Sequence, residues 1–196
     1  MADGGVYGLP FQHSVCVLFY NNDMLQAAGI EKAPSNWEEM LSAVTTLHAH
    51  NNKVVPLEFP ADVWVLENIA LSNSSSLIAS ASETTLEAAG VVASLDYLAQ
   101  LVKAGAMVNA NYAEGGEDFV AESTAMTINT TGNLGFIAAD ATFDWGVTTV
   151  PINTTPGLSY GGGGMIMMDG QSEAEEAASW EFMKYMTSPE ISAKWM

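Results

Sequence analysis

Short apolar runs alternate with longer amphipathic segments along most of the chain. Residues 15–20 form an uninterrupted run of β-branched, aliphatic and aromatic residues. A run of this kind, without polar alternation, predicts a strand that is covered on both faces. Other short apolar runs predict further strands at residues 54–59, 125–128, 145–150 and 165–168.

Between these runs, apolar residues recur at the spacing of an α-helix. The clearest stripe consists of Trp37, Met40, Leu41, Val44 and Leu47. Ser35, followed three residues later by Glu38, fits a capping box at the start of this helix, and Ser172 with Glu175 fits a second one. Further helices are predicted at residues 21–29, 63–71, 84–104, 117–121, 131–138, 172–186 and 188–196.

The alternation of strands with helices indicates an α/β fold in which helices flank a mostly parallel sheet. With 196 residues, the chain suits one large domain or two small ones. Residues 153–164 are rich in threonine, proline and glycine and are the best candidate for a boundary. No apolar run approaches the roughly 20 residues of a membrane-spanning helix. The N-terminus lacks the basic start and apolar stretch of a signal peptide, so none is predicted in this chain.

The charge of the chain restricts its partners. It has 23 acidic residues, five lysines and no arginine, which gives a formal net charge of −18. Nucleic acid and anionic membrane surfaces are therefore excluded as partners, because both require clustered positive charge. Arginine is also the usual bidentate partner of phosphate. Any tight anion site must therefore rest on backbone N–H groups or on a few lysines.

No pattern of residues predicts a catalytic centre. The nucleophile motif Gly-x-Ser-x-Gly is absent, and Cys16 lies inside the apolar run, where we expect a buried thiol. Glu114, Glu117 and Asp118 could hold calcium, but their spacing differs from that of an EF-hand loop. We therefore predict no catalytic residues, no cofactor and no metal site.

Aromatic and glycine-rich segments are better candidates for ligand binding. Trp64 lies just after a predicted strand and beside Asp62, a combination that binds sugars by stacking and hydrogen bonding; the alternative is that Trp64 packs in the core. His13 and Ser14 come directly before the buried strand, at the sheet edge where ligand sites are built. The glycines at 161–164 are either a flexible entry to a strand or a backbone surface that a ligand can approach closely.

Three sequence segments, each with more than one part, occur in a recognisable order. They are GLPFQHSVCVLFYNNDML at 8–25 with AG at 28–29 and PSNWEE at 34–39; STAMTIN at 123–129 with WGVTTVP at 145–151; and GGGG at 161–164 with EAASWEFMKYMTSPE at 176–190. Together they resemble the extracellular solute-binding proteins of ABC importers. The resemblance is to the maltose-binding-protein-like group, which takes up sugars, oligosaccharides and glycerol phosphates.

The resemblance implies a two-lobed binding protein with a periplasmic-binding-protein type II-like fold. It divides the chain into a crossing strand at 1–20, a nearly complete second lobe at 21–155, and a return strand with helices at 156–196 that belongs to an incomplete first lobe. The chain then corresponds to a fragment of a longer periplasmic or extracellular protein that works with an ABC permease. We expect the chain to bind its solute weakly by itself, because both lobes are needed to close the site.

The resemblance also implies which residues contact the solute, a small neutral carbohydrate or polyol. They lie before the crossing strand, after two strands of the second lobe and in the glycine-rich return: His13, Ser14, Asp62, Trp64, Asn129, Gly132, Asn133, Tyr160, Gly161 and Gly162.

Two other functions remain open. The chain could be a partner-binding protein that forms a homodimer through an exposed lobe surface, or a hydrolase on the same fold.

Overall fold

The computed structural model describes residues 5–195. The chain divides into two compact units. Unit 1 consists of residues 1–14 and 160–196, and unit 2 consists of residues 15–159. The chain therefore passes between the units twice, once within its first strand and once at Ser159–Tyr160.

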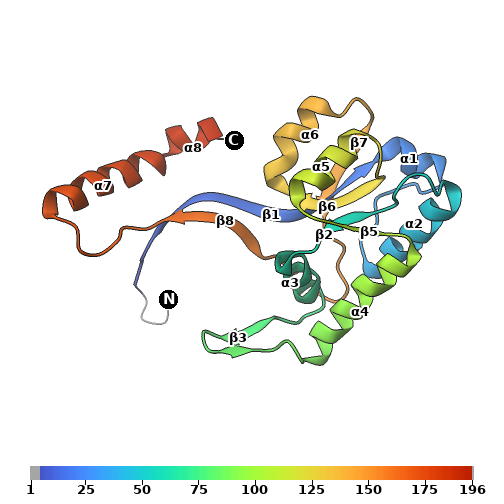
Figure 1. Cartoon of the computed structure of the whole chain (residues 1–196), viewed down its shortest axis with the longest axis horizontal. Helices are drawn as coiled ribbons and strands as arrows, with labels where there is room; N and C mark the ends of the chain where they lie inside the picture. The colour runs from blue at the N-terminus through green and yellow to red at the C-terminus, as the bar shows by residue number, and fades with distance from the viewer. Residues whose placement is uncertain (1–4, 196) are drawn as a thin grey trace. The chain divides into compact units, whose positions relative to one another are not determined.

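Unit 2 is built on a mixed sheet with the strand order β5-β2-β6-β1-β7 (Figure 1). The strands are β1 (Leu9–Asn21), β2 (Glu58–Pro60), β5 (Met107–Asn109), β6 (Met126–Thr130) and β7 (Trp145–Thr149). Strands β5, β2 and β6 are parallel, whereas β1 is antiparallel to both β6 and β7. All but one of these strands thus point the same way, and the expected mostly parallel sheet is confirmed.

The second half of strand β1 is buried on both faces because its side chains alternate between two cores. Cys16 and Leu18 point to the larger core, while Val17 and Phe19 point to a smaller one. Each of these four residues is at most 7% exposed. This double burial accounts for the uninterrupted apolar run in the sequence and confirms the predicted strand.

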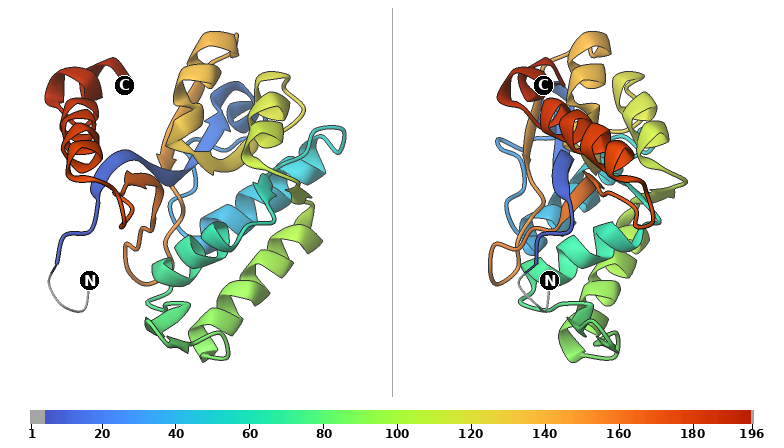
Figure 2. Two further views of the ribbon diagram at one scale, coloured as in Figure 1. Left: turned by 60° about the vertical axis from the view of Figure 1, so that its left-hand side comes forward. Right: turned by 90° about the vertical axis from the view of Figure 1, so that its left-hand side faces the viewer.

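Helices cover both faces of the sheet (Figures 1 and 2). Residues of α1, α2, α3 and α4 pack in the larger core, and residues of α5 and α6 pack in the smaller one. The helices are α1 (Asn22–Ala27), α2 (Trp37–His50), α3 (Val63–Ser72), α4 (Ala89–Ala104), α5 (Tyr112–Val120) and α6 (Leu134–Asp140), and a 3₁₀ turn, η1 (Thr131–Asn133), precedes α6. The unit is therefore a three-layer α/β structure.

Trp37 connects the helices over the larger core. Its ring stacks on Tyr97 of α4, with the ring centroids 4.1 Å apart and the planes 6° from parallel. Its Nε1 donates a hydrogen bond to Ser72 Oγ of α3 at 3.1 Å, and the Tyr97 hydroxyl donates to the Trp37 carbonyl oxygen at 3.3 Å. The apolar stripe predicted for this helix therefore faces the core.

Unit 1 contains a strand pair and two helices. Strand β8 (Tyr160–Met165) pairs with β1, and α7 (Glu173–Met186) and α8 (Pro189–Trp195) follow it. Gly162 has a φ of +114°, and a Cβ there would overlap the carbonyl oxygen of Gln12. Only glycine meets both conditions without strain. Within the described range, no helix is long and apolar enough to cross a membrane.

The short strands differ most from the predictions. The strand expected at 165–168 is wrong, because β8 begins at Tyr160 and its glycines take part in the pairing with β1. The strand expected at 54–59 is reduced to β2, with an isolated bridge between Val55 and Thr124; the intervening Pro56 has no N–H to give to a ladder. Strand β5 and the hairpin of β3 (Ile78–Ser80) and β4 (Glu83–Thr84) were not predicted, since segments of two or three residues carry no usable periodicity.

Several helix boundaries also differ. The helix predicted at 84–104 begins only at Ala89, because Thr84 belongs to β4. Its end is as predicted, with Gly105 in the left-handed conformation. The helix predicted at 117–121 begins at Tyr112, because Gly115 and Gly116 lie inside it rather than before it. The capping box of Ser172 and Glu175 at the start of α7 is confirmed.

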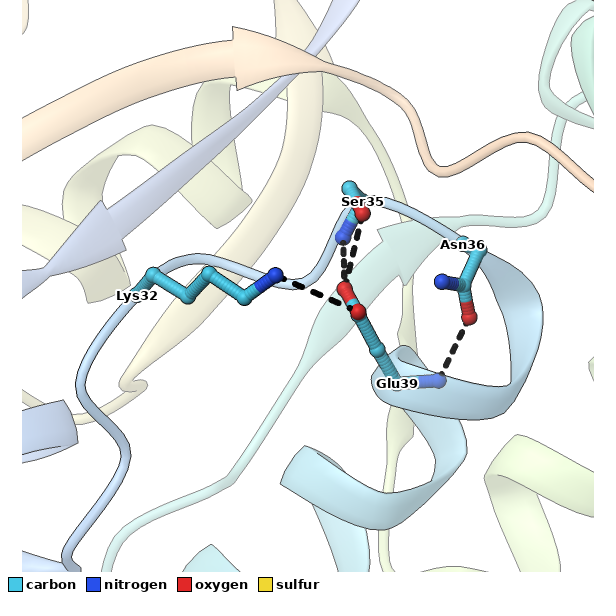
Figure 3. Close-up of polar contacts among 4 residues, drawn as sticks. All are labelled: Lys32, Ser35, Asn36 and Glu39. Atoms are coloured by element: carbon cyan, nitrogen blue, oxygen red, sulfur yellow. Dashed lines mark hydrogen bonds and ion pairs between the residues drawn. The ribbon is translucent and has the colours of Figure 1, made fainter.

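The cap of α2 lies one residue further along than predicted (Figure 3). Asn36, not Ser35, is the N-cap residue, and its Oδ1 accepts a hydrogen bond from the Glu39 backbone N–H at 2.9 Å. Glu39 Oε2 in turn accepts bonds from the backbone N–H and the hydroxyl of Ser35, both at 2.8 Å. Lys32 Nζ lies 3.3 Å from Glu39 Oε1. These bonds lower the pKa of Glu39 to about 2.

Loss of the Asn36 cap should destabilise unit 2. We expect Asn36→Ala to lower the free energy of unfolding by about 1 kcal/mol, because a backbone N–H of the first turn loses its acceptor. Chemical denaturation measures this difference. Ser42→Ala, at an exposed position of the same helix, is the matched control and should change stability little. Equal losses in the two variants would show that the cap contributes nothing.

Candidate functional site

The residues expected to bind ligand fall into two groups, one in each unit. Unit 2 holds Asp62, Trp64, Asn129, Gly132 and Asn133. Unit 1 holds the remainder, which are His13, Ser14, Tyr160, Gly161 and Gly162. In both units, residues from distant parts of the sequence come together.

Asp62 and Trp64 are fixed at the start of α3, directly after β2. The exposed Asp62 is the N-cap residue, and its Oδ1 accepts a hydrogen bond from the Trp64 backbone N–H at 2.8 Å. The half-buried Trp64 ring donates from Nε1 to the Ser159 carbonyl oxygen at 3.2 Å. The indole ring is thus held against rotation, and the carboxylate of Asp62 lies just before it in the chain.

Tyr112 joins this pair from the start of α5 and was missed by the sequence analysis. Its ring meets Trp64 edge to face, with centroids 5.8 Å apart and planes at 67°. Its hydroxyl is buried and has no hydrogen-bond partner among residues 5–195. Burial raises the pKa of Tyr112, and the negative charge of Asp62 raises it further.

A sequence signal for Tyr112 did exist. Asn111 caps α5 through its Oδ1, which accepts from the Glu114 backbone N–H at 3.0 Å. Glu114 Oε2 accepts from the Ala110 backbone N–H at 2.8 Å. This Asn-x-x-Glu spacing is that of a capping box and would have moved the helix start to Tyr112.

Two asparagines hold the backbone of Tyr112. Asn129 Nδ2 and Asn133 Nδ2 donate to the Tyr112 carbonyl oxygen at 2.9 and 2.8 Å, and Asn133 Nδ2 also lies 2.9 Å from Asn129 Oδ1. Asn129 is completely buried. Asn133 is half-buried, and Gly132 beside it is exposed on the 3₁₀ turn. Asn129 therefore acts on the site through Tyr112, whereas Asn133 and Gly132 lie nearer the surface.

The parallel strands explain why these segments meet. Asp62 and Trp64 follow β2, Tyr112 follows β5, and Asn129 lies at the end of β6. Because these three strands are parallel, their carboxyl ends share one edge of the sheet, which is where α/β proteins bind ligands. The result is an aromatic corner, formed by Trp64 and Tyr112, with a carboxylate and an amide beside it. Such a set suits a ligand with apolar C–H faces and hydroxyl groups.

The unit 1 group lies on the β1–β8 pair. The rings of His13 and Tyr160 are 6.0 Å apart and tilted by 45°, and both residues are exposed. Gly162 packs against the backbone of Gln12 and His13, so pairing with β1 is the reason for glycine there. The glycine-rich segment is therefore part of a strand and not a flexible entry to one.

Other candidate groups of the sequence occupy structural positions. Cys16 is buried, as predicted, and burial together with the nearby charge of Asp62 raises its pKa to about 12, so the thiol remains protonated. Glu114, Glu117 and Asp118 lie in α5, not in a loop. In the described part of the chain, no group of three histidine, cysteine, aspartate or glutamate side chains is placed to hold a metal ion.

The sequence profile of the bacterial extracellular solute-binding proteins matches residues 1–196. The chain belongs to this family. The resemblance carried by the three sequence segments is thereby confirmed. A similar protein is the sn-glycerol-3-phosphate-binding periplasmic protein UgpB of Rhizobium meliloti (strain 1021), which is 25% identical over 210 residues. That match covers 98% of this chain and 48% of the relative, so the chain spans about half the length of the relatives that it matches.

Solved structures confirm the expected fold of this solute-binding family member. UgpB from Mycobacterium tuberculosis, in complex with glycerophosphocholine, superimposes with a TM-score of 0.87 at 21% identity over 99% of this chain and 53% of that one. The GacH receptor of Streptomyces glaucescens, solved unliganded and with acarbose, gives 0.84 at 21% identity over 98% of this chain and 51% of that one. At this identity, the likeness extends to the fold and not to the ligand.

Close packing of α5 is required to place Tyr112, and Gly115 permits it. A Cβ at Gly115 would lie 2.5 Å from Asn109 Nδ2 and 3.0 Å from Thr127 Oγ1. We expect Gly115→Ala to destabilise the chain by about 1–3 kcal/mol through overpacking. Gly135→Ala in α6 is the matched control, because a Cβ there meets nothing within 4 Å. It should stabilise the chain by up to about 1 kcal/mol. Urea denaturation distinguishes the two, and a stabilising effect of Gly115→Ala would contradict the packing argument.

Proposed function

We propose that this chain binds a small, neutral, hydroxyl-rich solute for an ABC importer, as the ligand-binding part of a periplasmic or extracellular protein. Membership of the bacterial extracellular solute-binding family supports the binding role. The relatives are named as periplasmic binding proteins, which favours binding over catalysis and supports this location. The observation that carries the proposal is the aromatic corner of Trp64 and Tyr112 beside the Asp62 carboxylate.

We assign each residue of the unit 2 group a different contact with the ligand. The Trp64 ring offers an apolar face to the C–H groups of a sugar or polyol. The Asp62 carboxylate accepts hydrogen bonds from the ligand's hydroxyl groups, and the Asn133 amide accepts or donates them. Gly132 contributes polar groups of its backbone. Asn129 holds Tyr112 in place. For unit 1 we propose a second set of contacts from His13, Ser14, Tyr160, Gly161 and Gly162.

The distribution of positive charge favours a neutral ligand. The chain has no arginine, and none of its five lysines belongs to the unit 2 group. Lys32, Lys184 and Lys194 lie within ion-pair distance of glutamates. A phosphate group would therefore depend on backbone N–H groups and neutral side chains. The named ligands of similar proteins include both kinds, since one binds sn-glycerol 3-phosphate and another was solved with ribitol.

We further propose that the chain binds weakly by itself, as a fragment of a longer binding protein. Its matched relatives are about twice as long, with 48% of the Rhizobium meliloti protein covered. Unit 1 exposes large apolar side chains, including Ile166 and Phe182, which are 66% and 59% exposed. Further chain covering them would remove this apolar surface from water. Submicromolar affinity of the isolated chain would contradict this proposal.

Calorimetric titration with ribitol, maltose, glycerol 3-phosphate and glycerophosphocholine tests the ligand class. We expect heat from a neutral polyol or sugar, and an affinity roughly tenfold lower in Trp64→Ala, which corresponds to about 1.4 kcal/mol. Trp64→Phe should retain most of the affinity because it keeps an aromatic face. Asp62→Asn keeps the N-cap acceptor but removes the charge, so it should weaken binding without loss of stability.

Trp180→Ala is the control for these binding variants, since Trp180 is an exposed tryptophan on α7 of unit 1. It should bind like the unaltered chain. If Trp64→Ala and Trp180→Ala weaken binding equally, the aromatic corner is not the site. If only the phosphate-bearing compounds bind, the neutral-ligand proposal fails.

A further inference from the structure

A buried polar cluster lies between the sheet and α5. Glu58 of β2 and Thr127 of β6 are opposite one another in the strand register, and both are completely buried. Asn109 of β5 is 5% exposed, and its Nδ2 lies 3.5 Å from Glu58 Oε2. Leu57 and Phe59 pack in the larger core, so strand alternation turns Glu58 toward the opposite face, which α5 covers.

Among the described residues, the Glu58 carboxyl receives one hydrogen bond, from Asn109 Nδ2 to its Oε2. Glu58 Oε1, Asn109 Oδ1 and Thr127 Oγ1 are all buried without a hydrogen-bond partner in the described part of the chain. A carboxylate and an amide oxygen can only accept hydrogen bonds. Leaving such atoms unpaired in the interior costs free energy. A proton on the Glu58 carboxyl would supply a hydrogen-bond donor and reduce this cost.

The charges around Glu58 are negative. From α5, the helix packed over it, the carboxylates of Asp118 and Glu114 face this group, while β5 and β6 contribute the neutral Asn109 and Thr127. Burial raises the pKa of Glu58 most, and the charges of Asp118 and Glu114 raise it further, to about 7. The hydrogen bond from Asn109 opposes this rise. Asp118 lies one helical turn after Gly115, which packs against Asn109 and Thr127, so it is on the face of α5 that covers Glu58.

We propose that Glu58 is a positioning residue: one proton shared by the carboxyls of Glu58 and Asp118 holds α5 on the sheet and thereby keeps Tyr112 at the candidate site. Two ionised carboxylates repel one another and cannot hydrogen-bond. When Glu58 takes a proton from water, its O–H donates to Asp118, and the proton returns to water when Glu58 ionises. The first turn of α5 carries Tyr112, so a helix held by this bond also holds the aromatic corner. The part of this proposal that concerns ligand affinity rests on the proposed function.

The direction of the pH effect follows from the higher pKa of Glu58 in the folded chain. The folded state keeps the proton while the unfolded state, with an ordinary glutamate pKa near 4.5, releases it. This contribution to stability is complete below pH 4.5 and is lost as the pH rises from 4.5 to about 7. Above pH 7, α5 should loosen. At pH 8, about one tenth of the molecules would keep the proton, so apparent affinity should fall roughly tenfold relative to pH 6.

The first experiment needs no ligand. Carbon NMR of the whole chain, labelled at the glutamate carboxyl carbons and assigned with Glu58→Gln, reports the titration of Glu58 directly. Amide hydrogen exchange of α5, corrected for the intrinsic pH dependence, reports whether the helix loosens in the same range. We expect a titration midpoint near 7 accompanied by loss of protection around Tyr112. A midpoint near 4.5, or an unchanged α5, overturns the proposal.

The second experiment follows affinity for ribitol and maltose from pH 6 to pH 8. Glu58→Gln supplies a permanent donor to Asp118, so its affinity should be independent of pH and equal to that of the unaltered chain at pH 6. Asp118→Asn removes the facing charge and supplies a donor, so the Glu58 midpoint should fall. Glu117→Gln, an equal charge change at an exposed position of α5, is the control and should keep the original profile. An unchanged pH profile in Glu58→Gln, or the same change in Glu117→Gln, overturns the proposal.

The two proposals can fail separately. If no compound binds to any variant, the proposed function fails, and the NMR midpoint with α5 protection still decides the role of Glu58. If Glu58→Gln does not fold, Asp118→Asn and the titration of the unaltered chain carry the test. Binding of ribitol or maltose that is equal at all pH values, with a Glu58 midpoint near 4.5, supports the proposed function and overturns the positioning role.

Discussion

The double burial of β1 is the constraint on which the rest of unit 2 depends. A strand that places Cys16 and Leu18 in one core and Val17 and Phe19 in another requires a layer of helices on each face. The adjacent strands β6 and β7 then take their register from it, with Leu18 opposite both Ile128 and Thr148. A slip of one residue would exchange the two cores, so this register is strongly specified.

The site depends on the same sheet through its parallel part. Strands β2, β5 and β6 end at one edge, and the chain segments that follow them carry Trp64, Tyr112 and Asn133. Helix caps then fix the direction of each segment: Asp62 at α3 and Asn111 at α5. The amide of Asn129 ties two of the segments together through the Tyr112 carbonyl. The side chains available for a ligand are thus held by backbone geometry that the sheet dictates.

Much of this could be predicted from the sequence, and the failures have physical reasons. The apolar run of β1, the stripe of α2 and the cap of α7 are local patterns that tertiary packing reinforces. Tyr112 escaped prediction because β5 is only three residues long and because Gly115 and Gly116 resemble helix breakers. In the structure, Gly115 allows α5 to approach polar side chains of the sheet, and Gly116 allows it to approach Asn133 and Phe136. These contacts are between segments far apart in the sequence, so no local pattern reveals them. The pairing of β8 with β1 escaped for the same reason, since a run of glycines has no side-chain pattern to read.

The absence of arginine from the chain bears directly on the buried carboxyl of Glu58. A buried carboxylate is tolerable when a cation pairs with it, and arginine is the residue that most often serves this purpose inside proteins. This chain has no arginine, and α5 faces Glu58 with carboxylates. Protonation is then the remaining way to bury the group, because a neutral acid carries its own donor. The two proposals thus share one premise: the scarcity of positive charge that supports a neutral ligand at the sheet edge also supports a proton on Glu58 beneath α5.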